Sequence, residues 1–125
     1  MILKAFKMNI EELRDYCIQK KGVTEEFPFD EVTLVFKVMG KMFALIALER
    51  MPPQCNLKCD PEKAITLREE YDGDIIPGYH MSKKHWNTLL LNNLPPRVII
   101  ELVDHSYNLV VSKLTKNLKE QLAAL

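Results

Sequence analysis

The chemically densest part of the sequence is the segment 77–88. It gathers two of the three histidines, the single tryptophan and a pair of adjacent lysines. Loops that carry such side chains on a rigid scaffold are frequent sites of binding and catalysis. The candidate site residues in this segment are Tyr79, His80, Lys83, Lys84, His85 and Trp86. Histidines are suited to acid–base chemistry, whereas lysines and aromatic rings are suited to binding an anionic or planar ligand.

Acid–base catalysis is the first reaction class to consider. His80 and His85 are five residues apart, and no nucleophile or carboxylate near them completes a catalytic motif. A catalytic histidine needs such a partner within hydrogen-bond reach. Cys55 or Cys59 would serve as a nucleophile only if the fold brought it to the segment, and both are predicted to be buried. We therefore expect a protein that is not an enzyme and that uses no cofactor.

The three cysteines are predicted to be free thiols. Cys55 and Cys59 alternate with Asn56 and Lys58 along a predicted strand, which places them about 13 Å apart at ~3.3 Å per residue. That separation is too large for two ligands of one zinc ion, so no metal site is expected. Cys17 falls on the apolar face of a predicted helix. An odd number of cysteines without a secretory segment predicts a reduced, cytoplasmic protein.

The composition is that of an ordinary globular domain. The chain has 125 residues, of which 47% are hydrophobic and 27% charged, with 17 basic and 17 acidic side chains. A net charge of zero argues against strong electrostatic binding to nucleic acid or membrane. Residues 1–77 carry 11 basic and 14 acidic side chains and residues 78–125 carry 6 and 3, a modest asymmetry that also arises by chance. No apolar run reaches the ~18–20 residues of a membrane span, so no membrane partner is expected.

The chain is predicted to form one domain over residues 8–125, preceded by a flexible extension of residues 1–7. The first helix has the clearest start, because Asn9 and the glutamate three residues later form a capping-box pattern. Asp60 followed by proline predicts the start of a second helix. A long, widely apolar helix is expected over residues 95–114, and a short last helix should follow it.

Two details of the C-terminal helices are also predicted. Glu101 and His105 lie one turn apart in the polar stripe of the long helix, which predicts a solvated ion pair. In the last helix the leucines are predicted to pack back onto the domain. These leucines are Leu118, Leu122 and Leu125.

Residues 23–59 have the pattern of strands. Residues 27–29 are expected to form a short edge piece, since proline cannot donate to a central ladder. Residues 32–38 and 42–48 follow, joined by a tight hairpin at residues 39–41. The second of these strands is apolar on both faces and should be central, and a further strand is expected over residues 86–91. Strands clustered between helices predict an α+β fold, with an antiparallel sheet and helices packed against it.

Several segments together resemble one known family. They read GVTEEFPF at 22–29, LVFKV at 34–38, NLKCDP at 56–61, GYHM and HWNT within 78–88, and DHSY at 104–107. In this combination and order the chain closely resembles the MmcQ/YjbR family of small bacterial proteins, over about residues 8–122. The resemblance implies an architecture like that of the bacterial frataxin homologue CyaY and of the double-wing DNA-binding domain.

The resemblance also implies a function, because members of this family are often described as DNA-binding proteins by analogy of fold. The hairpin would act as a wing, lysines would contact phosphates, and aromatic side chains would stack on bases of a single strand. The residues expected to bind nucleic acid or another ligand are Lys37, Lys41, Lys58, Tyr79, His80, Lys83, Lys84, His85 and Trp86.

Two other interpretations of the same residues stay open. The chain could instead be a module that binds a protein or a small ligand through residues 79–86, because tryptophan and tyrosine are enriched at binding anchors. Alternatively, Trp86 is a core residue at the start of a strand, and the pair Lys83 and Lys84 forms a solvated turn.

Overall fold

The protein folds around one antiparallel sheet of six strands. The computed structural model describes residues 7–78 and 81–125. The elements in chain order are α1 (Ile10–Ile18), β1 (Val23–Glu26), β2 (Thr33–Val38), β3 (Lys41–Ala47), β4 (Gln54–Lys58), α2 (Pro61–Glu70), β5 (Ile75–Pro77), β6 (Trp86–Leu90), the 3-10 helix η2 (Leu91–Asn93), α3 (Pro96–Ser112) and α4 (Lys116–Ala123). The strand order is β1-β2-β3-β4-β6-β5, and every neighbouring pair is antiparallel. The predicted α+β class is confirmed.

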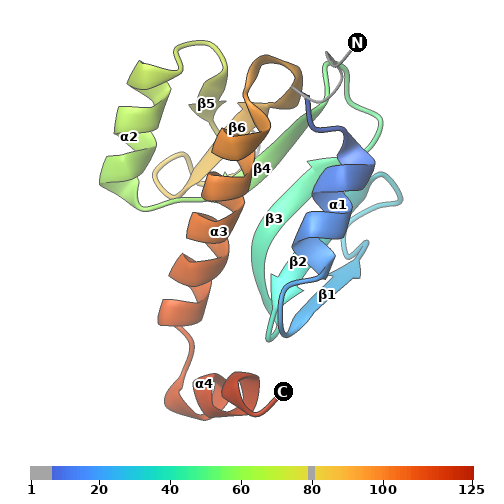
Figure 1. Cartoon of the computed structure of the whole chain (residues 1–125), viewed down its shortest axis with the longest axis vertical. Helices are drawn as coiled ribbons and strands as arrows, with labels where there is room; N and C mark the ends of the chain where they lie inside the picture. Colours follow the sequence, from blue (N-terminus) through green and yellow to red (C-terminus); the bar gives the residue numbers. More distant parts are fainter. Residues whose placement is uncertain (1–6, 79–80) are drawn as a thin grey trace.

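The helices are distributed unevenly over the sheet. Figure 1 shows α1 and α3 in front of the sheet, with α2 at the side of β5 and α4 beyond the end of the β2–β3 hairpin. Contacts follow this arrangement, since α3 packs on β2, β3 and β4, α1 on β1, and α2 on β5. In the part of the chain that the structure describes, no helix is long and apolar enough to cross a membrane.

The first helix starts as its sequence predicts. The Glu12 amide donates to Asn9 Oδ1 at 2.8 Å, and the Asn9 amide donates to Glu12 Oε1 at 3.1 Å. This reciprocal pair satisfies two amides that the first turn leaves without intrahelical partners. Leu13 and Cys17 then lie on the buried face of α1. The predicted place of Cys17 in the core is confirmed.

The β2–β3 hairpin turns at two residues with left-handed backbone. Met39 has φ 49° and Gly40 has φ 84°. A pair of residues with positive φ is typical of the two-residue turns that match the twist of antiparallel strands. β3 then runs through the inside of the sheet, with Phe43 and Ile46 in the helix-side core and Leu45 in a second cluster. β3 is therefore covered on both faces, as its sequence predicts.

The long helix α3 is joined to the sheet by apolar contacts and by one buried serine. Ser106 has no exposed surface. Its hydroxyl donates to the Phe43 carbonyl at 2.6 Å and accepts from the Lys58 amide at 3.0 Å. One side chain on α3 thus satisfies backbone groups of both β3 and β4. The buried apolar residues of α3 are Val98, Ile99, Leu102, Val103 and Val110.

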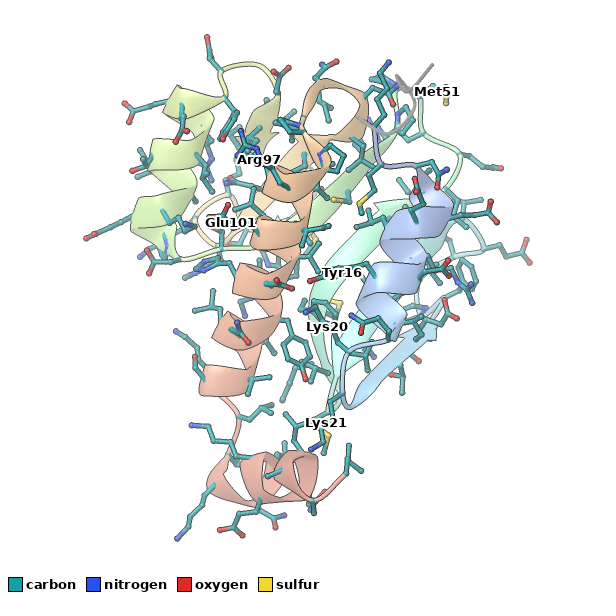
Figure 2. All side chains as sticks on the ribbon, in the orientation of Figure 1. Tyr16, Lys20, Lys21, Met51, Arg97 and Glu101 are labelled. Atoms are coloured by element: carbon teal, nitrogen blue, oxygen red, sulfur yellow. The ribbon has the colours of Figure 1, made fainter. Side chains whose placement is uncertain are left out.

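A polar cluster joins α1 to α3. The Tyr16 hydroxyl donates to Asp104 Oδ1 at 2.7 Å, and Lys20 Nζ lies 2.5 Å from the same oxygen. Lys20 Nζ also lies 4.8 Å from the ring centre of Tyr16 and 5.1 Å from that of Tyr107. Figure 2 shows Tyr16 and Lys20 in the space between the two helices. Burial raises the pKa of Tyr16 to about 12, and the bond to Asp104 acts in the same direction. The cluster is therefore a structural tie between helices.

The structure corrects the expected edges of the sheet. Residues 27–32 form a loop, and the edge strand is β1, which ends at Glu26. The opposite edge is β5, a strand of 3 residues that the sequence did not predict. Strand formation at both edges depends on a partner elsewhere in the chain, which local propensity does not reveal.

Two predictions for the C-terminal helices were also wrong in detail. Glu101 and His105 do not form the predicted ion pair; His105 Nε2 instead accepts a hydrogen bond from the Asp60 amide at 3.2 Å. Burial lowers the pKa of His105, and the nearby Lys63 acts in the same direction. A neutral ring fits the acceptor role of Nε2. Leu118 and Leu122 pack back onto the domain as predicted, whereas Leu125 is 68% exposed.

Candidate binding surface on the helix-free face of the sheet

The second face of the sheet is the candidate binding surface. The strand register places five residues side by side on this face, one from each of five neighbouring strands. These residues are Val35, Leu45, Asn56, Thr88 and Ile76. The apolar cluster on this side contains no helix residue, whereas the main core contains residues of all four helices. We call this side the helix-free face, since none of the described helices packs on it.

Trp86 anchors one end of this face. It belongs to a small cluster with Val35 and Leu45, against which Met42 and Met81 pack. Trp86 is 7% exposed, so its ring is unavailable to stack on a base. The predicted stacking role of Trp86 is therefore wrong, and the alternative interpretation of Trp86 as a core residue at the start of a strand is correct.

The residues around Trp86 are fixed by backbone hydrogen bonds. The Gly78 amide donates to the Trp86 carbonyl at 2.9 Å, and the Cys59 amide donates to the His85 carbonyl at 2.8 Å. Arg68 on α2 adds a side-chain tie, because its Nε donates to Asn87 Oδ1 at 2.7 Å and its Nη2 donates to the carbonyl of Lys83. Residues 82–86 are thus attached to β4, β5 and α2.

Three of the predicted lysines belong to the backbone at this attachment. Lys58 is opposite Trp86 in the ladder, and Lys83 and Lys84 are exposed shortly before Trp86 in the chain, followed by the exposed His85. Among the residues that the structure describes, these three lysines take part in no ion pair. We call these three residues, which belong to neighbouring backbone around Trp86, the lysine group.

The other predicted site residues are separate from the lysine group. Lys37 Nζ lies 2.6 Å from Glu26 Oε1, so its charge is matched on the neighbouring strand. Lys41 is exposed beside the hairpin turn, which Figure 1 shows well away from the junction of β4 and α2. Of the two lysines predicted for the wing, only Lys41 has no ion-pair partner among the described residues. Tyr79 and His80 lie outside the described residues.

A pocket of about 390 Å³ opens on the helix-free face beside the lysine group. Its floor is made by β2, β3 and β4, and its walls by the loops that precede β2, follow β3 and precede β6. Its lining residues are Phe29, Asp30, Thr33, Leu45, Ala47, Arg50, Gln54, Cys55, Asn56 and Met81. A volume of this size falls in the range of roughly 300–1,000 Å³ that is typical of small-ligand sites.

The polar groups of the pocket are partly engaged by the protein itself. Asp30 Oδ1 accepts from the amides of Val32 and Thr33 at 2.9 and 2.7 Å, and Oδ2 accepts from the Thr33 hydroxyl at 3.1 Å. The bond from the Val32 amide, assisted by both Thr33 groups, lowers the pKa of Asp30. Asn56 Oδ1 accepts from the Thr88 hydroxyl at 2.5 Å. Asp30 thus supports its loop. Asn56 lines the pocket, and its side chain is held by Thr88 on the neighbouring strand β6.

Sequence reasoning missed most of this pocket. The one available signal was on β4, where Gln54, Asn56 and Lys58 alternate with the buried Cys55 and Leu57. That alternation predicted a polar face on β4 but not the segments that wall it. The remaining lining residues come from loops with no periodic pattern, so only the tertiary structure brings them together.

The three cysteines are enclosed in the fold. All three cysteines are free and buried. Within residues 7–78 and 81–125, no group of three His, Cys, Asp or Glu side chains is placed to bind a metal ion. Burial raises the pKa of Cys17 to about 12 and that of Cys59 to about 11, and it raises that of Cys55 as well.

We expect the thiols of the folded protein to be unreactive. Because the thiolate is the nucleophile, buried thiols with raised pKa should react with a colorimetric disulfide reagent at pH 8 far more slowly than free cysteine. The same reagent should titrate all three thiols once guanidinium unfolds the chain. Rapid reaction of any thiol in the folded protein, without loss of structure, would contradict the burial described above.

The geometry defines a small α+β protein with a pocket and a group of lysines on one face of its sheet. The YjbR family model matches residues 18–109. The chain therefore belongs to the YjbR family, as its motifs predict. It is 34% identical over 119 residues to the uncharacterized protein YjbR of Escherichia coli K12, covering 94% of this chain and 100% of that protein.

Other relatives agree with this assignment. The uncharacterized protein YbdF of Escherichia coli O157:H7 is 40% identical over 91 residues, which cover 72% of this chain and 74% of that protein. A crystal structure of a Deinococcus radiodurans protein with a DUF419 domain superposes with a TM-score of 0.86 at 38% identity. The match covers 95% of this chain and 90% of that one. These comparisons support the family and the fold.

Proposed function

We propose that this protein is a binding protein, not an enzyme, and that it binds single-stranded nucleic acid along the helix-free face. The observation that carries the proposal is the lysine group, in which Lys58 is opposite Trp86, Lys83 and Lys84 come just before Trp86, and none has an ion-pair partner in the described chain. Unpaired lysines near a pocket on this face are suited to phosphates, because counterion release then favours binding.

The geometry favours a single strand over a duplex. A duplex is usually read by a helix or a two-stranded ribbon in the major groove. No described helix lies on the helix-free face, and the β2–β3 ribbon has Lys37 matched by Glu26. Single strands are instead bound on positively charged grooves and flat surfaces with aromatic platforms. The lysine group and the neighbouring pocket fit that pattern.

The proposal predicts a salt dependence that can be removed by substitution. If Lys58, Lys83 and Lys84 each contact one phosphate, the logarithm of the association constant should fall with the logarithm of salt concentration with a slope near −2, from ~0.7 per contact on single strands. A variant with alanine at all three positions should bind more weakly at low salt and lose most of that slope. Fluorescence anisotropy with a labelled oligonucleotide measures both.

A matched control is available on α4 and the end of α3. Lys113, Lys116 and Lys119 are also exposed, and their replacement by alanine removes the same charge from a region that Figure 1 shows far from β6. This control should keep the original slope. Equal losses in the two triple variants, or no oligonucleotide binding by the unaltered protein at low salt, would refute the proposal.

A second candidate function is binding of another protein, which a specific surface feature favours. Of seven large apolar side chains that are exposed among the described residues, five belong to the loops before β2 and after β3. These five are Phe27, Phe29, Val32, Leu48 and Met51. Contiguous exposed apolar residues often mark protein interfaces. Such an interaction would persist at high salt and would survive loss of the lysine group, which separates it from the first proposal.

A further inference from the structure

We propose that the pocket on the helix-free face binds one nucleobase of a single-stranded nucleic acid. This inference rests on the proposed function, and it names the part of the ligand that the pocket receives. The lysine group would hold phosphates, and the pocket would take a base that is turned out of the strand. Recognition of unstacked bases in this way is common among proteins that bind single strands.

The pocket is large enough for a bicyclic ring. Its volume is about 390 Å³. An enclosed cavity of roughly 150 Å³ is sufficient to hold a benzene ring. The additional space leaves room for a second ring and for part of a sugar. Its floor consists of strand residues, Leu45 and Ala47 among them, which gives a planar guest a firm apolar base.

One wall of the pocket is an exposed aromatic ring. Phe29 lines the pocket and is 65% exposed. An exposed phenylalanine ring gains no stabilisation from burial, so its exposure is consistent with a binding role. Base stacking on such a ring is sequence-tolerant, because every base has a π-face. Phe29 directly precedes Asp30, whose three hydrogen bonds to Val32 and Thr33 fix the local turn of this loop. The ring is therefore presented from a braced position.

The polar lining matches the edge of a base better than it matches a charged group. Gln54 and Asn56 supply carboxamides, which both donate and accept hydrogen bonds as base edges do. The two charged residues of the lining, Asp30 and Arg50, have opposite sign. The pocket thus has no net charge from its side chains, so phosphate attraction falls to the lysine group alone.

The pocket and the lysine group are connected along β4 and the loop before β6. Asn56 and Lys58 point to the same face of β4, two residues or about 6.6 Å apart. Met81 lines the pocket and lies two residues before Lys83. A base in the pocket would therefore leave its backbone next to the lysine group, which is the arrangement that a nucleotide requires.

The test compares two ligands of equal charge. One is a short labelled oligonucleotide, and the other is a fully abasic phosphodiester chain of the same length. We expect the oligonucleotide to bind at least tenfold more tightly. The Phe29→Ala variant should lower affinity for the oligonucleotide about tenfold, at the lower end of what stacking of one base contributes. The same variant should leave the abasic chain and the salt slope unchanged.

The control substitution comes from the same loop. Phe27 is also an exposed aromatic residue, at 48%, but it does not line the pocket. Phe27→Ala should leave oligonucleotide affinity close to that of the unaltered protein. Because both rings are exposed, both variants should fold, and thermal melting checks this. Equal binding of the abasic chain and the oligonucleotide, with no effect of Phe29→Ala, would overturn the pocket proposal and leave the lysine-group proposal standing.

Free nucleosides test the pocket proposal without the lysine-group proposal. A nucleoside carries the base but no phosphate, so it probes the pocket without the lysine group. We expect the four nucleosides at millimolar concentration to shift the NMR resonances of Thr33, Gln54 and Asn56. If no oligonucleotide binds but nucleosides shift these resonances, the lysine-group proposal fails and the base pocket is supported. If nucleosides shift nothing and no oligonucleotide binds, both proposals fail.

Discussion

Replacement of Phe43 by alanine should lower the free energy of unfolding by about 3–5 kcal/mol, the usual range for removing a buried phenylalanine ring. Phe43 has no exposed surface. Its ring centre lies 6.5 Å from that of Phe36 and 5.6 Å from that of Tyr107, which it meets edge-on. These contacts join β2, β3 and α3, so the cavity left by the ring would lie where three elements meet and cannot easily collapse.

Phe43 is also the residue whose carbonyl accepts the hydroxyl of Ser106 at 2.6 Å. If the backbone of β3 shifts to fill the cavity, that hydrogen bond is strained as well. Urea unfolding, followed by the fluorescence of the single tryptophan, measures the change. The control is Phe29→Ala, which removes an identical ring that is 65% exposed and should change stability by less than about 0.5 kcal/mol. Similar losses in the two variants would show that Phe43 does not hold the core together.

The parts of the fold that sequence predicted are those with local signals. The start of α1 is marked by the capping box of Asn9 and Glu12, and the start of α4 by the Thr115 hydroxyl, which accepts from the Leu118 amide at 3.2 Å. Capping of this kind is decided within one helical turn. The alternation in β2 and β3 likewise follows from the period of a strand, so both strands were predicted within a residue or so of their observed ends.

The parts that sequence missed are non-local. β5 has only 3 residues and ends in Pro77, and it exists because Ile75 and Ile76 find Leu89 and Thr88 on β6. Residues 27–29 had the composition of a strand but have no ladder partner, so they form a loop. Pairing rather than propensity decided both cases, since β-propensity depends strongly on context.

The candidate site divides in the same way. Lysines 58, 83 and 84 were predicted from composition, and the ladder between β4 and β6 accounts for their proximity. The pocket was not predicted, because Phe29, Gln54 and Met81 belong to segments far apart in sequence. Trp86 was the most conspicuous residue of the segment 77–88, yet its contribution is structural. Its burial fixes the C-terminal end of the segment 77–88, and this segment carries Lys83 and Lys84.

That dependence leads to the second large effect, which we expect from Gly78→Ala. A β-carbon at this position would lie 2.7 Å from Trp86 Cβ and 2.9 Å from the Trp86 carbonyl oxygen. Both contacts are shorter than real β-carbons show, and one involves backbone, so strands must separate for the methyl group to fit. The Gly78 amide donates to the same carbonyl at 2.9 Å, and this bond should lengthen or break. We expect a loss of about 1–3 kcal/mol, the usual cost of overpacking.

Gly73→Ala is the matched control. Gly73 has φ 82° with no atom within 4 Å of an added β-carbon, so alanine there meets only the cost of left-handed backbone, about 1–2 kcal/mol. The two variants should therefore have similar free energies of unfolding, but only Gly78→Ala should change the environment of the Trp86 ring. Gly78→Ala should shift the emission of this tryptophan to longer wavelength in the folded protein, whereas Gly73→Ala should not.

The same pair of variants tests whether the position of Trp86 matters for binding. Because Lys83 and Lys84 lie between Gly78 and Trp86 in the chain, a displaced Trp86 should move both lysines away from Lys58. Gly78→Ala should then weaken oligonucleotide binding at temperatures where the variant is still folded, and Gly73→Ala should leave binding unchanged. An unshifted tryptophan spectrum with normal binding in Gly78→Ala would show that β5 and β6 can separate there without disturbing the lysine group.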